Sequence, residues 1–379
     1  MKFIHTADWH LGRSFHEVNL VEDQEYILAE LIVLIEKEKP DVLIVAGDVY
    51  DRAQPAVDAI RLLENTINTI VLEMEVPLVM IAGNHDSPDR LAFGSQLYMD
   101  NGLHIAGPNT SKVIISDEHG EVDIHLIPYA RPEEARAAGL ALKNLSHDAA
   151  IEAQVEACVA AGVSKRSIGV AHAFVTNCES SESERYLSVG GASTVSADHF
   201  DVFAYTALGH LHRPQEVRDN VQYSGSLLKY SFSETEHVKG VIVGEIDAKG
   251  NVTTEFVELE PRRDVRIMKG EFKELHHPQG KVASRRDYIE FKLTDKVPVI
   301  NPMSRLREIY PNALSVRRLE FESAGADATA TGRHRLKPAD LFANLFEEMS
   351  GEPLSKKEIK AFSEILADVQ KNEQNLEGN

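Results

Sequence analysis

The first 260 residues of the chain predict a layered α/β sandwich whose strands are covered on both sides. Short, nearly all-apolar runs alternate with segments of helical periodicity as far as Ala82, and strand-rich sequence follows them. Apolar runs without a polar alternation are typical of strands that are buried on both faces. With 379 residues, the chain is long enough for one large domain with smaller appendages.

The opening elements follow a β-α-β-α-β order. Lys2–Thr6 is predicted as a buried strand. Asp23–Glu38 is predicted as a helix, because its apolar residues recur every three to four positions and Pro40 ends the pattern. Asp41–Ala46 is the second buried strand. The next helix and strand are Val57–Met74 and Pro77–Ala82.

Strands dominate the sequence between residues 122 and 259, with one predicted helix, Asp148–Val159, among them. The predicted strands are Val122–Ile127, Ser167–Ala171, Val202–Leu208, Val221–Ser224, Val238–Ile246 and Thr253–Leu259. In α/β folds of this kind, chemistry collects where strands end and loops begin.

The pattern changes around Pro261, and we expect separate domains beyond it. Residues 261–322 predict a small α+β module, whose elements after a first strand at Val265 are Asp287–Leu293, Met303–Ile309 and Leu314–Leu319. Residues 323–336, rich in Ala, Gly and Thr, predict a linker. Residues 337–379 follow, with two short amphipathic helices, Pro338–Met349 and Lys356–Val369.

Composition limits the class of protein. The formal net charge of −20 disfavours strong nucleic-acid binding by this chain alone, although bound cations or a partner subunit can supply positive charge. The sequence contains no apolar run long enough to cross a membrane, and its first residues do not resemble a signal peptide. Cys158 and Cys178 cannot form a disulfide framework. We therefore expect a cytoplasmic protein.

Five predicted strands are each followed by a polar motif. The motifs are Asp8-Trp9-His10, Gly47-Asp48, Gly83-Asn84-His85-Asp86, His172 after the strand IGVA, and Gly209-His210-Leu211-His212. In an extended segment, residues i and i+2 point to the same side, so the D-x-H and H-x-H pairs are expected to converge.

Together the motifs supply two carboxylates, one amide oxygen and four imidazoles. Two divalent ions roughly 3.5–4 Å apart need about this many ligands, and they can hold the attacking hydroxide and the phosphoryl oxygens of an in-line displacement. Mixed His and carboxylate ligation suits Mn, Fe or Zn better than Mg. The sequence therefore predicts a two-metal phosphoesterase with these ligands: Asp8, His10, Asp48, Asn84, His172, His210 and His212.

The order D-x-H, G-D, G-N-H-D and G-H-x-H resembles the signature of the calcineurin-like metallophosphoesterase superfamily. Within it, IHTADWHLG, VAGDVYDR, IAGNHDS and ALGHLHRPQ followed by YSGS are similar to the SbcD family of nuclease subunits. The resemblance covers most of the chain. It implies an α/β/β/α sandwich with a small α+β capping domain and C-terminal helices.

The resemblance also implies roles for single residues. One ion would be held by Asp8, His10, Asp48 and His212, and the other by Asp48, Asn84, His172 and His210, so that Asp48 bridges them. His85 would contact the scissile phosphate or protonate the leaving oxygen, and Asp86 would orient it. Archaeal relatives carry a second site histidine shortly after the bridging aspartate, where this chain has Asp51, to which no role is assigned.

Residues outside the motifs are candidates for contacts with DNA and with a partner. Arginines near strand-end loops are candidates for DNA-backbone contacts, although each alone is more typical of a surface charge: Arg13, Arg52, Arg90, Arg131 and Arg185. The apolar faces of the C-terminal helices predict docking into a partner groove. These faces consist of Leu341, Phe342, Leu345, Phe346, Ile359, Phe362, Ile365 and Leu366.

By resemblance, we expect a Mn-dependent DNA nuclease subunit of repair and recombination, with exonuclease action on double-stranded ends and endonuclease action on hairpins. It would form a homodimer and a heterotetramer with an SbcC-type ATPase. The chain contains no G-x-x-x-x-G-K-[ST] motif, which agrees with ATP use by the partner. One alternative is a small-molecule or cyclic-nucleotide phosphodiesterase, which the acidic charge favours and the capping module disfavours. Another is a non-catalytic scaffold, against which the complete ligand set argues.

Overall fold

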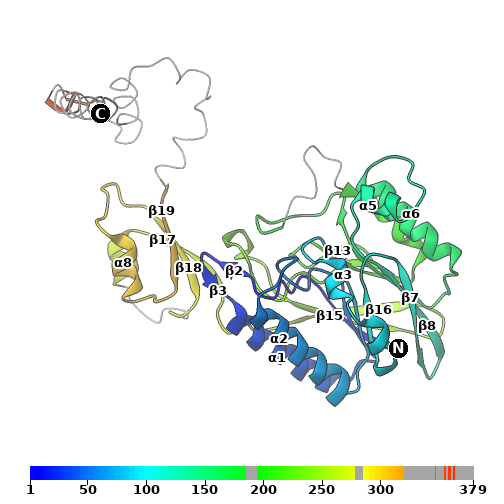
Figure 1. The fold of residues 1–379 in the computed structure, drawn as a ribbon. Coiled ribbons are helices and arrows are strands. Elements are labelled where there is room, and N and C mark those ends of the chain that lie inside the picture. The colour runs from blue at the N-terminus through cyan, green and yellow to red at the C-terminus, as the bar shows by residue number, and fades with distance from the viewer. Residues whose placement is uncertain are drawn as a thin grey trace, which may run out of the picture. The chain divides into compact units, whose positions relative to one another are not determined.

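The computed structural model describes residues 1–184, 194–277 and 285–319, together with 346, 354, 355, 357–359 and 362 (Figure 1). The chain divides into two compact units. The first consists of Met1–Arg266 with Arg286–Tyr288, and the second of Ile267–Arg285 with Ile289–Asn379. The expected linker at 323–336 lies outside the described residues, and the functional domains expected from the sequence stay predictions.

The first unit contains two six-stranded sheets. The first sheet has the order β16-β15-β1-β4-β5-β6. Its strands β1, β4, β5 and β6 are parallel, with Phe3 opposite Val42 and Ile44 opposite Val79. Their carboxyl ends therefore lie at one edge. The strands are β1 (Lys2–Thr6), β4 (Val42–Val45), β5 (Leu78–Ile81), β6 (Leu103–Ala106), β15 (Gly240–Ile246) and β16 (Val252–Glu258).

The second sheet has the order β13-β14-β12-β9-β8-β7. The strands β8, β9, β12 and β14 run parallel, and Gly209 at the end of β12 lies opposite His172 at the end of β9. The strands are β7 (Ser111–Asp117), β8 (Gly120–Ile127), β9 (Ser167–His172), β12 (Tyr205–Gly209), β13 (Gln215–Arg218) and β14 (Val221–Tyr223).

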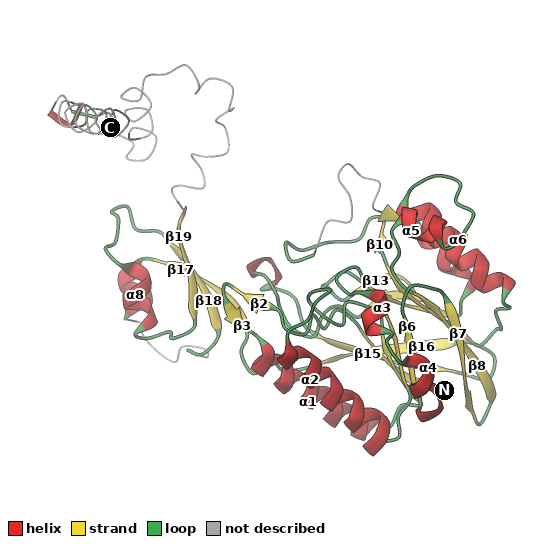
Figure 2. Ribbon diagram, viewed as in Figure 1, coloured by secondary structure: helices red, strands yellow, loops and turns green. Residues whose placement is uncertain are grey.

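The two sheets pack face to face around an apolar core. Phe3 and Ile44 of the first sheet share this core with Ile124 and Val170 of the second, and all four side chains are fully buried. Helix α6 packs Ile151 and other apolar residues against the outer face of the second sheet, while α1 and α2 cover the first sheet (Figure 2). The predicted α/β/β/α sandwich is confirmed.

The helices of the first unit and its short elements connect these strands. The α-helices are α1 (Val21–Glu38), α2 (Val57–Ile67), α3 (Pro88–Leu91), α4 (Ser95–Tyr98), α5 (Pro132–Ala137) and α6 (His147–Ala160). The short strands are β2 (Ser14–Phe15), β3 (Val18–Asn19), β10 (Phe174–Val175) and β11 (Thr194–Val195). The other helical turns are η1 (Asn68–Glu73), η2 (Met99–Asn101), η3 (Ala197–Val202) and η4 (Phe232–Glu234).

Some elements differ from the prediction for identifiable reasons. The helix predicted over Val57–Met74 changes to a π-helix at Asn68, in which Ile70 and Val71 are buried. The strand predicted from Val202 begins at Tyr205, because a 3-10 turn closes with a hydrogen bond from Phe203 N–H to Phe200 O. The sequence missed β6 and β7, which lie at sheet edges and are only partly buried.

The second unit is an α+β module built on a three-stranded sheet of order β17-β18-β19. Phe272, Phe291 and Tyr310 are among the residues that form its core. Its elements are β17 (Val265–Gly270), α7 (Phe272–His276), β18 (Tyr288–Leu293), α8 (Pro302–Arg307) and β19 (Ala313–Arg318). Among the described residues, no helix has the length and apolarity that a membrane span requires.

The apolar residues of the C-terminal segment are only partly described. Phe346, Ile359 and Phe362 adopt helical conformation, as predicted. The remaining residues of the predicted partner-binding faces lie outside the described residues: Leu341, Phe342, Leu345, Ile365 and Leu366. The expected docking of these helices into a partner therefore stays a prediction.

Candidate metal centre

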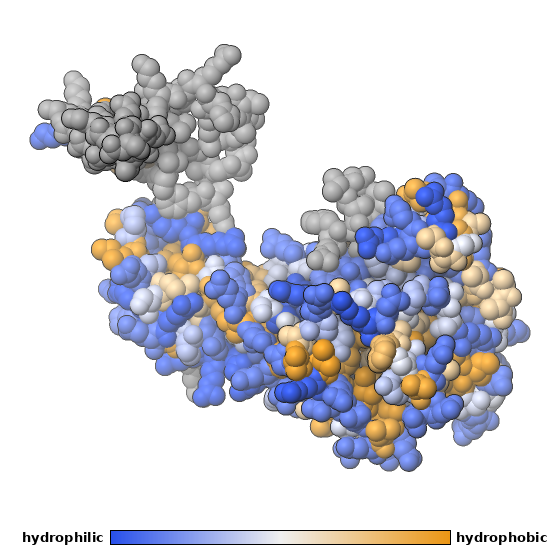
Figure 3. Space-filling view, in the orientation of Figure 1, coloured by the Kyte–Doolittle hydropathy of each residue, from blue (hydrophilic) through white to orange (hydrophobic). Residues whose placement is uncertain are grey.

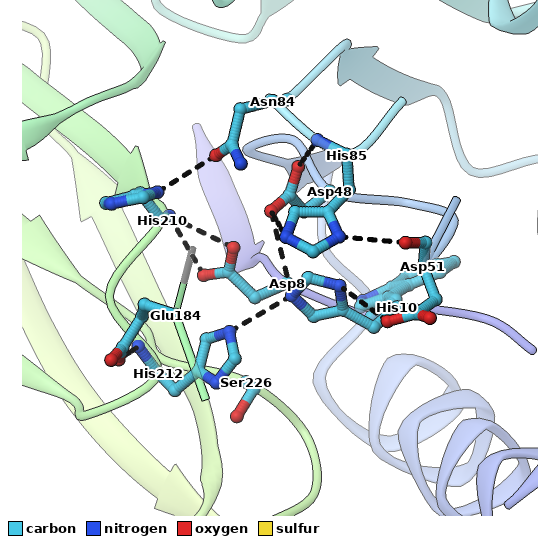
Figure 4. Close-up of polar contacts among 12 residues, drawn as sticks. Asp8, His10, Asp48, Asp51, Asn84, His85, Glu184, His210, His212 and Ser226 are labelled. Atoms are coloured by element: carbon cyan, nitrogen blue, oxygen red, sulfur yellow. Dashed lines mark hydrogen bonds and ion pairs between the residues drawn. The ribbon is translucent and has the colours of Figure 1, made fainter. Parts of the chain in front are cut away.

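The structure brings the seven predicted ligands together at the carboxyl edge of the two sheets, and Figure 4 labels all of them except His172. Ligand atoms of Asp8, His10 and His212 lie within 4.8 Å of one another, as do those of Asp8, Asp48 and His172. The side-chain oxygen of Asn84 contacts both His172 and His210. It lies 2.9 Å from His172 Nε2 and 3.0 Å from His210 Nδ1.

The ligands converge by a different backbone geometry from the expected one. We expected Asp8 and His10 to share a side of an extended segment, but β1 ends at Thr6, and these two residues have φ angles of 54° and 45°. Asp48 and His210 also have positive φ, at 49° and 106°. This left-handed region is unfavourable for residues with a side chain, and such strain is concentrated at functional sites. Tight turns, rather than strand alternation, therefore aim these side chains.

Two glycines allow the loops of the site to approach closely. Gly47 has a φ of +91°, and a Cβ atom on it would lie 2.4 Å from His172 Nδ1. A Cβ atom on Gly83 would lie 2.2 Å from Asp48 Oδ1. Contacts this short cannot be accommodated without moving a ligand. The glycines of the G-D and G-N-H-D motifs are thus required by the packing of the site itself.

The two carboxylate ligands are buried and held by backbone donors. Asp8 accepts the His210 N–H on both oxygens, at 3.0 and 3.1 Å, and Asp48 Oδ1 accepts the His85 N–H at 2.8 Å. Burial raises the pKa of Asp8 to about 6, against the attraction of His172. Burial also acts to raise the pKa of Asp48, but the hydrogen bond to His172 and the combined attraction of His172, His10 and His85 hold the pKa well below its usual value.

The imidazoles of His10 and His212 point their Nε2 atoms at one another. His10 Nε2 and His212 Nε2 lie 3.0 Å apart. Burial holds the pKa of His10 and of His210 well below the usual value, so both rings are neutral near neutral pH. Lone pairs that face one another across such a distance fit a cation between them. The donor set of nitrogen and oxygen atoms therefore fits divalent metal ions.

His172 shows how strongly the site attracts positive charge. Its Nδ1 lies 2.9 Å from the Ala46 carbonyl oxygen, and its Nε2 lies 3.5 Å from Asp48 Oδ2. Burial alone lowers the pKa of His172, but the carboxylates of Asp48 and Asp8 raise it to about 9. A proton on this ring then supplies part of the positive charge that a metal ion would bring.

His85 lies beside the ligands and is oriented by Asp51. Its Nδ1 lies 2.8 Å from the Asp51 carbonyl oxygen, and its Nε2 faces Asp48 Oδ2 at 4.0 Å. Donation from Nδ1–H to that carbonyl turns Nε2 toward the metal ligands. Asp51 therefore has a role that sequence reasoning did not assign.

Asp86 does not have the position that we expected for it. Its carboxylate accepts backbone N–H groups of Val49, Tyr50 and Gly83 at 2.9–3.1 Å, instead of orienting the His85 ring. Burial, reinforced by repulsion from Asp48, raises the pKa of Asp86 to about 7. Asp86 thus ties the loop after β4 to the loop after β5, and it acts on the site through the backbone.

The candidate DNA-contact arginines differ in their surroundings. Arg13 is largely buried: it donates to Asp51 Oδ1 at 3.2 Å and to the Ser183 carbonyl at 3.0 Å, and it stacks on the Tyr230 ring. These contacts identify Arg13 as a structural link beneath the site. The other described candidates, Arg52, Arg90 and Arg131, are exposed, and Arg185 lies outside the described residues.

Several residues that contact the ligands escaped the sequence analysis. Gln24 of α1 donates to the Trp9 and His10 carbonyls at 3.2 and 2.7 Å. His212 contacts three residues of two further segments: Ser183, Glu184 and Lys239. These residues lie outside the strand-end motifs, so no local pattern marked them. Trp9 is buried beneath the site and donates to Thr6 Oγ1 at 3.0 Å.

Comparison with known proteins identifies family profiles and solved structures that are similar to this chain. A profile described as calcineurin-like phosphoesterase matches residues 1–214, and one described as type 5 capsule protein repressor C-terminal domain matches residues 261–350. Among solved structures, a dimetal phosphatase from Danio rerio is 14% identical, with a TM-score of 0.42 over 69% of this chain and 98% of that chain.

Two curated relatives are each named as the SbcD component of the nuclease SbcCD. The protein from Staphylococcus saprophyticus is 35% identical, over 97% of this chain and 98% of its own length. The protein from Staphylococcus epidermidis is 36% identical, over 85% of this chain and 86% of its own length. The chain therefore belongs to the calcineurin-like phosphoesterase family and, within it, to the SbcD family of nuclease subunits.

Proposed function

We propose that this protein is a manganese-dependent nuclease that hydrolyses DNA phosphodiester bonds at double-stranded ends and in hairpins. The observation that carries the proposal is the convergence of the seven ligands around Asp48, with His85 beside them. The names of the two relatives support DNA as the substrate class.

Different residues of the chain have different roles in the proposed reaction. When bound, two divalent ions supply the positive charge that activates a water molecule and stabilises the phosphoryl oxygens. Asp48 lies between the two ligand groups and is fixed by the His85 N–H at 2.8 Å. When the His85 ring carries a second proton, on Nε2 opposite the nitrogen that donates to the Asp51 carbonyl, it can pass that proton to the leaving 3′ oxygen. Asp86 and Gln24 hold the loops that carry these groups.

Manganese is the proposed metal because the mixed ligand set favours Mn, Fe or Zn over Mg, and the resemblance to the SbcD family points to Mn among these three. Carboxylate and amide oxygens suit Mg and Mn, whereas four imidazoles disfavour Mg. The chain presents both kinds of donor in one site. Mn accommodates both, and we expect it to support the highest activity.

Cleavage of a hairpin-ended linear duplex tests the proposal directly. With Mn, and with an SbcC-type partner and ATP where needed, we expect the hairpin to be opened and the ends to be degraded. Chelation by EDTA should abolish both activities, and Mn should restore them. Inertness toward DNA under all of these conditions, together with hydrolysis of a cyclic nucleotide, would show that the protein is a small-molecule phosphodiesterase.

An SbcC-type ATPase is the proposed partner, and the C-terminal helices are its proposed docking segment. Deleting Lys337–Asn379 is expected to abolish co-purification with the partner, because the apolar faces around Phe346 and Phe362 are removed. The truncated chain should still bind Mn, since all metal ligands lie in the first unit. Retained co-purification would contradict helix-in-groove docking.

The proposal includes a homodimer of this chain. An apolar surface supports it: Phe93 is 83% and Leu97 78% exposed, next to an open groove of about 530 Å³ alongside α2 and η1. Figure 3 shows apolar side chains on the face where α2 and α4 lie. Exposed patches of this kind are typical of association sites. Sedimentation of the wild type and of Phe93→Asp should show a dimer and a monomer, respectively.

A further inference from the structure

The metal ligand His212 is held on three sides by residues outside the metal-binding motifs. Its Nδ1 lies 2.6 Å from Ser183 Oγ, its backbone N–H donates to Glu184 Oε1 at 2.8 Å, and its carbonyl accepts from Lys239 Nζ at 2.6 Å. Groups that contact the back of a ligand determine which of its atoms faces the metal.

The protons of this contact can be assigned. Ser183 Oγ lies 2.5 Å from Glu234 Oε1. An ionised carboxylate only accepts, so the Ser183 hydroxyl donates to Glu234. The hydroxyl oxygen then accepts from His212 Nδ1–H, and His212 Nε2 keeps its lone pair. That lone pair points to the same place as His10 Nε2, 3.0 Å away.

The charge on Glu234 is maintained by a buried partner. Lys239 Nζ donates to Glu234 Oε2 at 2.6 Å, and the Tyr230 N–H donates to Glu234 Oε1 at 3.1 Å. The side chains of Glu234 and Lys239 are 0% and 3% exposed. Burying such a pair contributes little to stability, because desolvation offsets the attraction. Its contacts with Ser183 and His212 link it instead to the metal site.

The two ligand groups differ in the residues that contact the imidazole nitrogens pointing away from the metal position. For His212, the hydroxyl of Ser183 links the ring to the carboxylate of Glu234. For His10, Nδ1 lies 3.7 Å from Asp51 Oδ1. The hydrogen-bond partner of His172 Nδ1 is the main-chain carbonyl of Ala46, at 2.9 Å, and Asp8 Oδ1 lies 4.0 Å from the same nitrogen. A carboxylate behind an imidazole raises its basicity as a ligand. The group of His10 and His212 also contains the carboxylate of Asp8, whereas the group of His172 and His210 contains the neutral amide of Asn84.

We propose that Ser183, Glu234 and Lys239 form a positioning relay for His212, and that the ion held with Asp8 and His10 binds more tightly than the ion held with Asn84. The inference rests on the two-ion site proposed above. The relay residues do not touch the substrate or the reacting atoms. They act by fixing the tautomer and the orientation of one ligand.

Manganese titration of the full chain without DNA tests the relay. The paramagnetic resonance signal of free Mn should show two binding steps for the wild type. His10→Ala should remove the tighter step and His172→Ala the other, which assigns the steps. Ser183→Ala should weaken the tighter step by about 10–100-fold and leave the other within about two-fold. Ser183→Thr, which keeps the hydroxyl, should preserve both steps.

Two further variants complete the experiment. Ser167→Ala is the matched control. It makes the same change at a buried serine that lies at the end of β9 opposite His172, and both binding steps should stay unchanged. Glu234→Gln removes the charge but keeps an acceptor, and it should weaken the tighter step as Ser183→Ala does. Loss of both steps together in Ser183→Ala, or of neither, would overturn the relay. Since no DNA is present, these results are independent of whether the protein cleaves DNA.

Discussion

Replacing His85 with leucine is expected to lower the rate of DNA cleavage by about 10²–10⁴-fold, the usual contribution of a general acid. Mn binding should be retained, because His85 holds Asp48 through its backbone N–H and not through its ring. The measurement is single-turnover cleavage of a hairpin-ended duplex at saturating Mn. The matched control is His104→Leu in β6, which should cleave at the wild-type rate.

The choice of leaving group separates proton donation from other roles of His85. A p-nitrophenyl phosphodiester needs no proton on its leaving oxygen, so His85→Leu should slow its hydrolysis far less than that of DNA. Equal losses on the two substrates would contradict proton donation and indicate that His85 binds the phosphate. Loss of Mn binding would instead identify His85 as a ligand.

Replacing Asp48 with asparagine is expected to reduce DNA cleavage to the level seen with EDTA. Asp48 is the carboxylate that both ligand groups approach, at 3.5 Å from His172 and 3.6 Å from His10. The amide oxygen of asparagine can still accept the His85 N–H, so the loop should keep its conformation. What is lost is the negative charge between the two ion positions.

Thermal unfolding with and without Mn measures this loss independently of activity. At about 100 times its Kd, each bound ion stabilises the native state by about 2.7 kcal/mol. The Mn-dependent rise in Tm should be present in the wild type and absent in Asp48→Asn. Asp100→Asn, the same change at an exposed position, should behave as the wild type. A full Mn-dependent rise in Asp48→Asn would exclude a bridging role.

The location of the site was predictable because it follows from strand order. Parallel strands that alternate with helices bring their carboxyl ends to one edge, and Asp8, Asp48 and Asn84 come just beyond three such strands. His172 and His210 follow the same logic in the second sheet. The D-x-H, G-D, G-N-H-D and G-H-x-H motifs therefore carried enough information to predict that these side chains come together.

The conformation of the ligands was not predictable from the same motifs. Strand periodicity implied an extended Asp8-Trp9-His10, whereas both polar residues adopt left-handed geometry. That geometry is fixed by hydrogen bonds from remote loops, such as Asp8 N–H to Gly47 O at 3.1 Å and His10 N–H to Asp48 O at 2.9 Å. Local sequence does not record contacts of this kind.

Long-range polar contacts account for the other differences. Asp86 was assigned to His85 because the two are adjacent in sequence, yet its carboxylate bonds to the backbone at Val49 and Tyr50. Ser183 lies 29 residues from His212 and 51 from Glu234 along the chain. The residues of the relay have no characteristic spacing along the chain, so they can be recognised only from the three-dimensional structure.

The central claim is that two metal ions lie on either side of Asp48. Anomalous scattering from crystals of the wild type grown with Mn, measured at the Mn absorption edge, tests it most directly. Two peaks roughly 3.5–4 Å apart are expected, one against Asp8, His10 and His212 and the other against Asn84, His172 and His210. A single peak, or peaks that leave Asp48 out of contact with either ion, would contradict the account.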